Sequence, residues 1–340
     1  MTNESRQRGM PRRTFIWSAA AAGLVAGSAS RLRPVFAGAK HKLKYVTFVN
    51  KDSVWGKPYH FLAEEVEKRA NGALSIEYAG GSEVIGGFDA PEAVSNGVFD
   101  ISHSANSYFA SAMPSSISLA SGSASLDALR QAGVLAAYDE ILGQKLGVKL
   151  LGVPMSNVGY VFMTKGRPDS LAYFKGKKVR SIPLYDPILQ ELGAATVTTS
   201  PAEAYTALER GVVDGLGWPD IGLFDYKFHE NAKYVMAPSF YTLRTTTLMN
   251  RASFDNLPAE LQSLLVEAAA AADKRGGEWC GETSANERAK MQDQGLEVVT
   301  LPDDEAKRFL AITEEKLWAK VLADSPEGGK RLKVLFDKAG

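Results

Sequence analysis

Hydrophobic and polar positions along the chain follow two patterns, one typical of strands and one typical of helices. In residues 56–72, Phe61, Leu62 and Val66 share one face at helical spacing, and Asn71 with the following glycine ends the helix. The predicted elements of this first part are strands at 42–49, 73–81 and 98–104 and helices at 56–72 and 89–97. This order of elements predicts an α/β fold with a largely parallel sheet.

The same order of elements begins again after residue 157. We predict strands at 158–165, 177–183, 196–200 and 212–218 and helices at 186–194 and 200–211. In the last of these helices Ser200 and Glu203 form a capping box, Pro201 takes the first helical position and Gly211 ends it. Asp186 is expected to cap the other helix. Two such units predict two lobes with a cleft between them.

The C-terminal part is predicted to be mainly helical. Residues 257–295 have an alanine-rich centre that favours one long helix, although Gly276 and Gly277 could bend it. A short strand at 297–302 and an amphipathic helix at 303–324 follow.

The N-terminal forty residues have the pattern of an export signal. A basic stretch beginning at Arg12 precedes a short apolar run and small residues suited to cleavage near Ala39. Arg12 and Arg13, followed by Phe15, resemble the twin-arginine type of signal, which exports folded proteins. The apolar run is shorter than the ~20 residues of a membrane-spanning helix. We predict a cleaved signal at 1–39 and a periplasmic protein without membrane insertion after cleavage; the alternative is a disordered basic N-terminus.

Charge and rare residues exclude several classes of function. Lysine and arginine total 39, as do aspartate and glutamate, so no overall field favours nucleic acid as a partner. Cys280 is the only cysteine, which leaves no intrachain disulfide and no lipid-bearing cysteine. The four histidines (His41, His60, His103 and His229) are too scattered for a metal site, and we expect no metal and no cofactor. The sequence has no nucleophile elbow, phosphate-binding loop or dinucleotide-binding motif. We therefore expect a protein without enzymatic activity.

Five segments, taken in their order and spacing, resemble one family. They are GGSEVIGGFDAPEAVSNGVFD, FKGKKVRSIP, LGAATVTTSPAEAYTALERGVVDG, KYV and NRASFDNLPAELQ. The set is similar to the substrate-binding proteins of TRAP (tripartite ATP-independent periplasmic) transporters of the C4-dicarboxylate-binding type. The resemblance covers the chain from about Leu43 to the C-terminus.

The resemblance implies a type II-like, two-lobed periplasmic binding protein of α/β class. Each lobe would hold a mostly parallel sheet flanked by helices, with one long helix across both. We assign residues 40–164 and 250–290 to lobe I, and residues 165–249 and 291–340 to lobe II. Such a receptor binds a small organic acid and delivers it to membrane permease subunits that use an ion gradient. The alternatives are a receptor of another importer class, such as an ABC importer, and a periplasmic enzyme.

Arg180 lies in the segment KKVRSIP, where the family has its signature arginine. The resemblance implies a two-pronged salt bridge from Arg180 to the carboxylate of the ligand. A guanidinium group has the planar geometry for this contact, which lysine lacks. The strand end is also where ligands bind in open α/β sheets. The alternative is an internal ion pair of Arg180 with Glu83 or Asp186.

Two departures from the family's patterns bear on the ligand. Gly217 stands where relatives that bind their ligand through a metal have a glutamate, which makes metal-assisted binding doubtful. Trp218 could instead wall in a flat part of the ligand or pack in the core, and Asp220 could accept a ligand hydroxyl or lie in a solvated turn. Tyr160 occurs in a segment where sialic-acid-binding members have a second arginine, so a single carboxylate with a neutral or aromatic remainder is favoured. Tyr160 itself could line the cleft or pack in the core.

Loops of the first lobe supply the remaining candidates. The family's topology implies that the loop after the first strand faces the cleft, with Ser53 as a hydroxyl contact and Trp55 as an aromatic wall. Asn106 and Tyr108 follow another strand and are expected at the same cleft.

Overall fold

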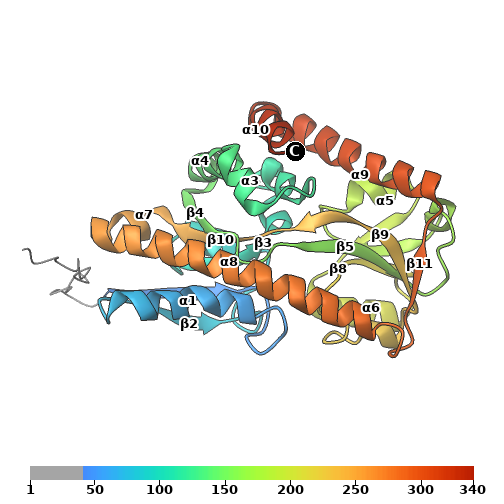
Figure 1. Cartoon of the computed structure of the whole chain (residues 1–340), viewed down its shortest axis with the longest axis horizontal. Helices are drawn as coiled ribbons and strands as arrows, with labels where there is room; N and C mark the ends of the chain where they lie inside the picture. Colours follow the sequence, from blue (N-terminus) through green and yellow to red (C-terminus); the bar gives the residue numbers. More distant parts are fainter. Residues whose placement is uncertain (1–40) are drawn as a thin grey trace, which may run out of the picture. The chain divides into compact units, whose positions relative to one another are not determined.

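The computed structural model describes residues 41–340, which form two β-sheets with helices packed around them (Figure 1). The predicted signal at 1–39 lies outside the described residues. No helix of the described part combines the length and the apolar character needed to cross a bilayer.

The first sheet has five strands in the order β2-β1-β3-β10-β4. Its strands are β1 (His41–Thr47), β2 (Leu74–Gly80), β3 (Ile101–Ala105), β4 (Val148–Gly152) and β10 (Thr245–Asn250). The helices of this part of the chain are α1 (Lys57–Ala70), α2 (Ala90–Ser95), α3 (Leu126–Gln131), α4 (Val134–Leu146) and α7 (Arg251–Asp255). One apolar core cluster lies between this sheet, α1 and the long helix α8 (Ala259–Lys290).

The second sheet has six strands in the order β11-β9-β5-β8-β6-β7. Its strands are β5 (Val158–Thr164), β6 (Lys178–Ser181), β7 (Ala195–Thr198), β8 (Gly215–Pro219), β9 (Tyr234–Leu243) and β11 (Glu297–Thr300). The helices near it in sequence are α5 (Asp186–Glu191), α6 (Pro201–Glu209), α9 (Asp303–Asp324) and α10 (Pro326–Ala339).

The predicted α/β fold with one helix-flanked sheet in each lobe is confirmed, and both sheets are mixed. In the first sheet β10 runs antiparallel to both of its neighbours, β3 and β4. In the second, β5 runs antiparallel to β8 and to β9. The antiparallel pairs follow from the connectivity. The chain passes from the first sheet to the second at β5 and returns at β10, and each of these strands lies between two other strands of its sheet.

Several segments connect the two lobes, among them α9, which contacts β9 as well as the 3₁₀ helix Pro114–Ala120. Residues 153–157 lead from β4 to β5, Arg244 leads from β9 to β10, and α8 extends past both sheets (Figure 1). The strands therefore change lobe at these points. β5 belongs to the second sheet and β10 to the first, whereas the predicted lobe bounds gave each of them to the other lobe.

Local sequence signals account for several element ends. Asn71, with a φ of 47°, closes α1 in the left-handed conformation. The predicted capping box of α6 is confirmed, since Glu203 accepts hydrogen bonds from both the backbone and the side chain of Ser200. Asp186 is the first residue of α5 rather than its cap, which is Tyr185. The helix predicted at 257–295 is continuous through Gly276 and Gly277.

Candidate functional site

Arg180 lies near the carboxyl end of β6, between two parallel neighbours. Its backbone is in register with Val197 of β7 and Leu216 of β8. The side chain is 2% exposed, and it is among the largest fully buried side chains of the described residues. The fold therefore places a full positive charge at the sheet edge where open α/β sheets bind ligands.

The guanidinium group of Arg180 has no carboxylate partner in residues 41–340. Nη1 donates to the carbonyl oxygen of Gly217 at 3.3 Å, and Nη2 donates to that of Thr199 at 2.8 Å. Nε is buried and has no hydrogen-bond partner. Among the described residues neither Glu83 nor Asp186 pairs with Arg180, whose terminal nitrogens bond to backbone carbonyl groups. A buried cation with an unpartnered nitrogen and no carboxylate partner is a candidate site for an external anion.

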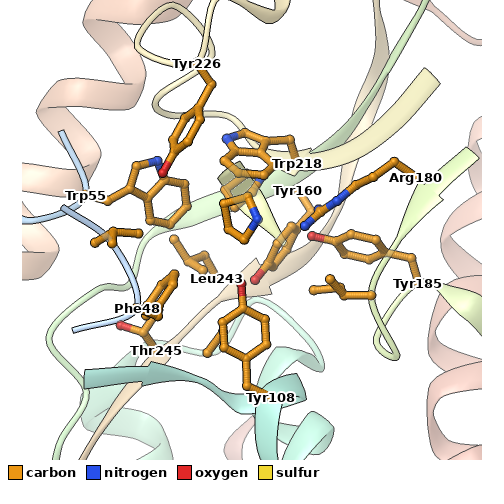
Figure 2. Close-up of a pocket in the computed structure, with 15 residues that line it drawn as sticks. Phe48, Trp55, Tyr108, Tyr160, Arg180, Tyr185, Trp218, Tyr226, Leu243 and Thr245 are labelled. Carbon is orange, nitrogen blue, oxygen red and sulfur yellow. The ribbon is translucent and has the colours of Figure 1, made fainter. Parts of the chain in front are cut away.

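Arg180 lines a pocket whose wall is otherwise aromatic or apolar (Figure 2). The space between these side chains is narrow, with about 30 Å³ open to the centre of a water molecule. It is lined by Phe48, Val49, Trp55, Ala105, Tyr108, Tyr160, Arg180, Ile182, Tyr185, Pro201, Trp218, Pro219, Tyr226, Leu243 and Thr245. In Figure 2, Arg180 enters the pocket from one side, and Phe48 and Trp55 face it from the other.

The charge of Arg180 acts on the tyrosines of the pocket. Burial raises the pKa of Tyr108 to about 12, and the positive charge of Arg180 opposes this rise. Burial likewise raises the pKa of Tyr160 and of Tyr185, again against the effect of Arg180. All three phenols therefore stay protonated at neutral pH, and each hydroxyl can donate a hydrogen bond to an anion beside the guanidinium.

Four of the residues predicted from sequence line this pocket together with Arg180. They are Trp55, Tyr108, Tyr160 and Trp218. Trp218 also packs edge-on against Phe228 at 4.8 Å between ring centres, so it has both a core face and a pocket face. The centre of its ring is 5.2 Å from the guanidinium carbon of Arg180, within cation–π range.

Ser53 lies in an adjoining outer hollow, which we call the entrance. It is lined by Phe48, Asn50, Asp52, Ser53, Ser82, Gly86, Gly87, Phe88, Tyr108, Ser200, Pro201, Asp225 and Tyr226. Phe48, Tyr108, Pro201 and Tyr226 line both hollows, so the entrance adjoins the pocket. The hydroxyl of Ser53 is already bonded to the carbonyl oxygen of Asn50 at 2.6 Å.

Asp220 and Asn106 are not among the residues that line the pocket. Asp220 is fully buried, forms an ion pair with Arg288 and accepts a hydrogen bond from Ser284 at 3.0 Å. Asn106 is also buried, and its amide donates to the carbonyl oxygen of Arg244, whereas its Oδ1 has no partner in the described residues. The side chain of Asp220 is therefore engaged with other side chains of the interior.

The pocket also contains residues that the sequence analysis missed. Tyr185 comes just after the strand that holds Arg180, so its position could have been found from the same strand-end argument. Thr245 belongs to β10, which was not predicted at all. A side chain at position 217 would meet the ring of Tyr185 at 2.7 Å, so Tyr185 takes the space beside the glycine. Among the described residues no three His, Cys, Asp or Glu side chains are grouped to hold a metal ion.

Comparison with protein families identifies the chain by its sequence. Residues 45–324 match the family described as bacterial extracellular solute-binding protein, family 7. The chain belongs to this family. It is therefore a solute-binding protein, and the pocket around Arg180 is its candidate solute site.

Relatives of the solute-binding protein include partial and nearly full-length matches. An uncharacterized protein of Haemophilus influenzae is 34% identical over 179 residues, which are 51% of this chain and 53% of that protein, so the match spans about half of each. A solute-binding protein of Albidiferax ferrireducens is 24% identical over 279 residues, or 75% of this chain and 78% of the relative.

Solved structures of TRAP periplasmic solute-binding proteins share the fold. One from Desulfovibrio salexigens with bound orotic acid has a TM-score of 0.80 at 19% identity, and covers 88% of this chain and 99% of its own. One from Rhodoferax ferrireducens with bound malonate has a TM-score of 0.77 at 22% identity, with 87% and 98% covered. A Bordetella pertussis extracytoplasmic solute receptor with pyroglutamic acid has a TM-score of 0.78 at 20% identity, with 87% and 99% covered.

Proposed function

We propose that this solute-binding protein takes up a small carboxylate in the pocket between its lobes and delivers it to a TRAP-type permease. The observation that carries the proposal is Arg180, a buried guanidinium group without a carboxylate partner in the described residues. A ligand carboxylate would pair with it, and the hydroxyl groups of Tyr108 and Tyr160 lie on the same pocket wall. The bound acids of the three solved relatives support this class of ligand.

The pocket has walls from both lobes, which supports binding by closure. Trp55 and Tyr108 come from loops that follow β1 and β3, whereas Arg180 and Trp218 come from β6 and β8. A ligand that touches both sets of residues stabilises the closed arrangement by the free energy of those shared contacts. Opening by bending at the connections between the lobes would then release the ligand to the permease.

Export and permease partnership complete the proposal. The Arg12-Arg13 pair supports export by the twin-arginine route, and the family supports a periplasmic location. Partner genes for one small and one large multispanning membrane protein beside this gene would support a TRAP permease. An adjacent ATPase gene would instead favour an ABC importer.

The function is tested by calorimetric titration of the purified protein with orotate, pyroglutamate, malonate and benzoate. For any acid that binds, Arg180→Ala should weaken affinity at least 30-fold, because truncating one partner of a buried charge pair costs about 2–5 kcal/mol. Arg180→Lys should also bind poorly, because lysine keeps the charge but loses the planar fork. The matched control is Arg210→Lys, an exposed arginine of the same lobe, which should bind like wild type. Near-wild-type affinity in Arg180→Lys, or no binding of any carboxylate, would contradict the proposal.

A further inference from the structure

The pocket can neutralise only one carboxylate. Arg180 is the single charged residue among the described residues that line it. The other polar groups of the wall are the hydroxyls of four tyrosines and one threonine and the indole nitrogens of two tryptophans. A second carboxylate inside this space would lose its water without gaining a cation.

The wall beyond Arg180 is shaped by aromatic rings that meet edge to face. Trp55 and Trp218 are in edge contact at 5.8 Å between ring centres, and Phe48 and Tyr108 at 5.3 Å. The space open to the centre of a water molecule is only about 30 Å³, so the aromatic walls lie close together. Aromatic walls in a space of this size favour a single flat ring, which packs on faces and edges. A polyhydroxylated open-chain acid has no flat apolar face to pack against these rings.

The entrance carries the opposite charge from the inner pocket. Asp52 and Asp225 line it, and no lysine or arginine is among its lining residues in the described part of the chain. Asp225 accepts a hydrogen bond from the backbone of Val54, which keeps its carboxylate in place. An anionic group at the far end of a bound acid would therefore face two carboxylates, whereas a neutral or hydrogen-bond-donating group would not be repelled.

We infer that the ligand is a monocarboxylic acid with one flat apolar ring, whose far end is neutral or donates hydrogen bonds. This inference rests on the proposed function and specifies its ligand class. The carboxylate lies against Arg180, the ring lies among Trp55, Trp218 and Tyr108, and the far end points toward Asp52 and Asp225.

The test is a calorimetric series of acids that differ at one feature each. Benzoate and 4-hydroxybenzoate represent the inferred class, terephthalate adds a second carboxylate at the far end, and cyclohexanecarboxylate removes the flatness. Succinate and galactonate represent open-chain diacids and polyhydroxylated acids. We expect the two benzoates to bind tightest, with terephthalate, succinate and galactonate each at least tenfold weaker and cyclohexanecarboxylate intermediate.

Two variants report on the entrance and on the wall. The double variant Asp52→Asn/Asp225→Asn removes both charges of the entrance. It should reduce the ratio of the affinities for benzoate and terephthalate at least threefold. Trp218→Leu should weaken the binding of benzoate more than that of cyclohexanecarboxylate. Trp279→Leu, at a residue outside the lining of the pocket and the entrance, should change the affinity for neither acid. If Trp218→Leu does not fold, Phe48→Leu serves the same purpose on the opposite wall.

The outcomes separate this inference from the function on which it rests. Tight binding of terephthalate, succinate or galactonate, equal to or better than benzoate, would overturn the ligand class and leave a carboxylate receptor. A benzoate–terephthalate difference unchanged by the entrance variant would overturn the role of the two aspartates. Binding of none of the six acids would count against both proposals.

Discussion

At the scale of single residues, two buried arginines show what makes one of them available to a ligand. Arg244 is 3% exposed, and its terminal nitrogens donate to the carbonyl oxygens of Leu119, Ser121 and Ala124. Burial lowers the pKa of Arg244 to about 10. Its hydrogen-bonding groups are thus directed at the protein itself. Among the described residues the buried Nε of Arg180 has no partner and lies beside the aromatic pocket, which leaves Arg180 capacity for a guest anion.

The ion pair of Asp220 and Arg288 leads to an asymmetric prediction. The side chain of Asp220 is 1% exposed and that of Arg288 is 54% exposed. Arg288→Ala would leave a buried carboxylate uncompensated and should lower the free energy of unfolding by about 3 kcal/mol. Asp220→Ala should cost less, because Arg288 can reach water.

Urea unfolding of both variants measures this difference. Lys290→Ala, an exposed change on the same helix, is the control and should be close to wild type. Equal losses for Asp220→Ala and Arg288→Ala would contradict the asymmetry.

At the scale of elements, α8 is the part that holds the binding loop and the connection between lobes together. From its C-terminal part Glu287 accepts hydrogen bonds from the backbone of Gly222 and Leu223, just after β8. Near its middle, Gly276 lies against the carbonyl oxygen of Pro154, in the segment that joins β4 to β5. One helix thus contacts both the loop behind Trp218 and a connection that must bend when the lobes move.

Two glycines of α8 allow a matched test of this contact. A Cβ at Gly276 would be 1.8 Å from the oxygen of Pro154, whereas a Cβ at Gly281 would meet nothing within 4 Å. Gly276→Ala should therefore destabilise the protein by about 2–3 kcal/mol through overpacking. Gly281→Ala should stabilise it by up to about 1 kcal/mol, because alanine favours the helix. Thermal and urea unfolding compare the two, and a stabilising Gly276→Ala would show that α8 does not depend on the close approach.

At the scale of the whole molecule, the two lobes touch beside the pocket. The backbone nitrogen of Val54, in the loop after β1, donates to the carboxylate of Asp225 at 2.7 Å, in the loop after β8. Trp55 and Trp218 meet on the same side. These contacts join residues of different lobes, so the structure corresponds to a closed arrangement, and opening must break them.

Substitutions at Asp225 separate the hydrogen bond from the charge. Asp225→Asn keeps an acceptor for Val54 and removes the charge, whereas Asp225→Ala removes both. For the same acid, Asp225→Ala should bind about 3–10-fold more weakly than Asp225→Asn, the net value of one hydrogen bond. Asp293→Ala, an exposed aspartate outside the pocket, is the control. Equal affinity of the two Asp225 variants would show that this bond does not contribute to closure.

Elements with strong local signals could be predicted, and elements that depend on distant partners could not. The helix α6 carries its own start and stop signals, and its capping box forms as expected. β10 has no such signals, because its position is decided by pairing with β3 and β4. Because β10 was not predicted, the point where the chain returns to the first lobe was placed differently. For the same reason Thr245 was not predicted as a pocket residue.

The sequence by itself determined the α/β class, most of the helices and strands, and a guanidinium group at a strand end. These features depend on the spacing of residues along the chain and on short motifs, which are local properties. Only the tertiary structure decided which polar side chains line the pocket. Asp220 forms an ion pair with Arg288, and Asn106 donates a hydrogen bond to the carbonyl oxygen of Arg244, each across a long sequence separation. It also surrounded Arg180 with aromatic rings from both lobes. The reason is that the sequence specifies the charge of each residue, whereas the packing of distant segments determines which groups that residue contacts.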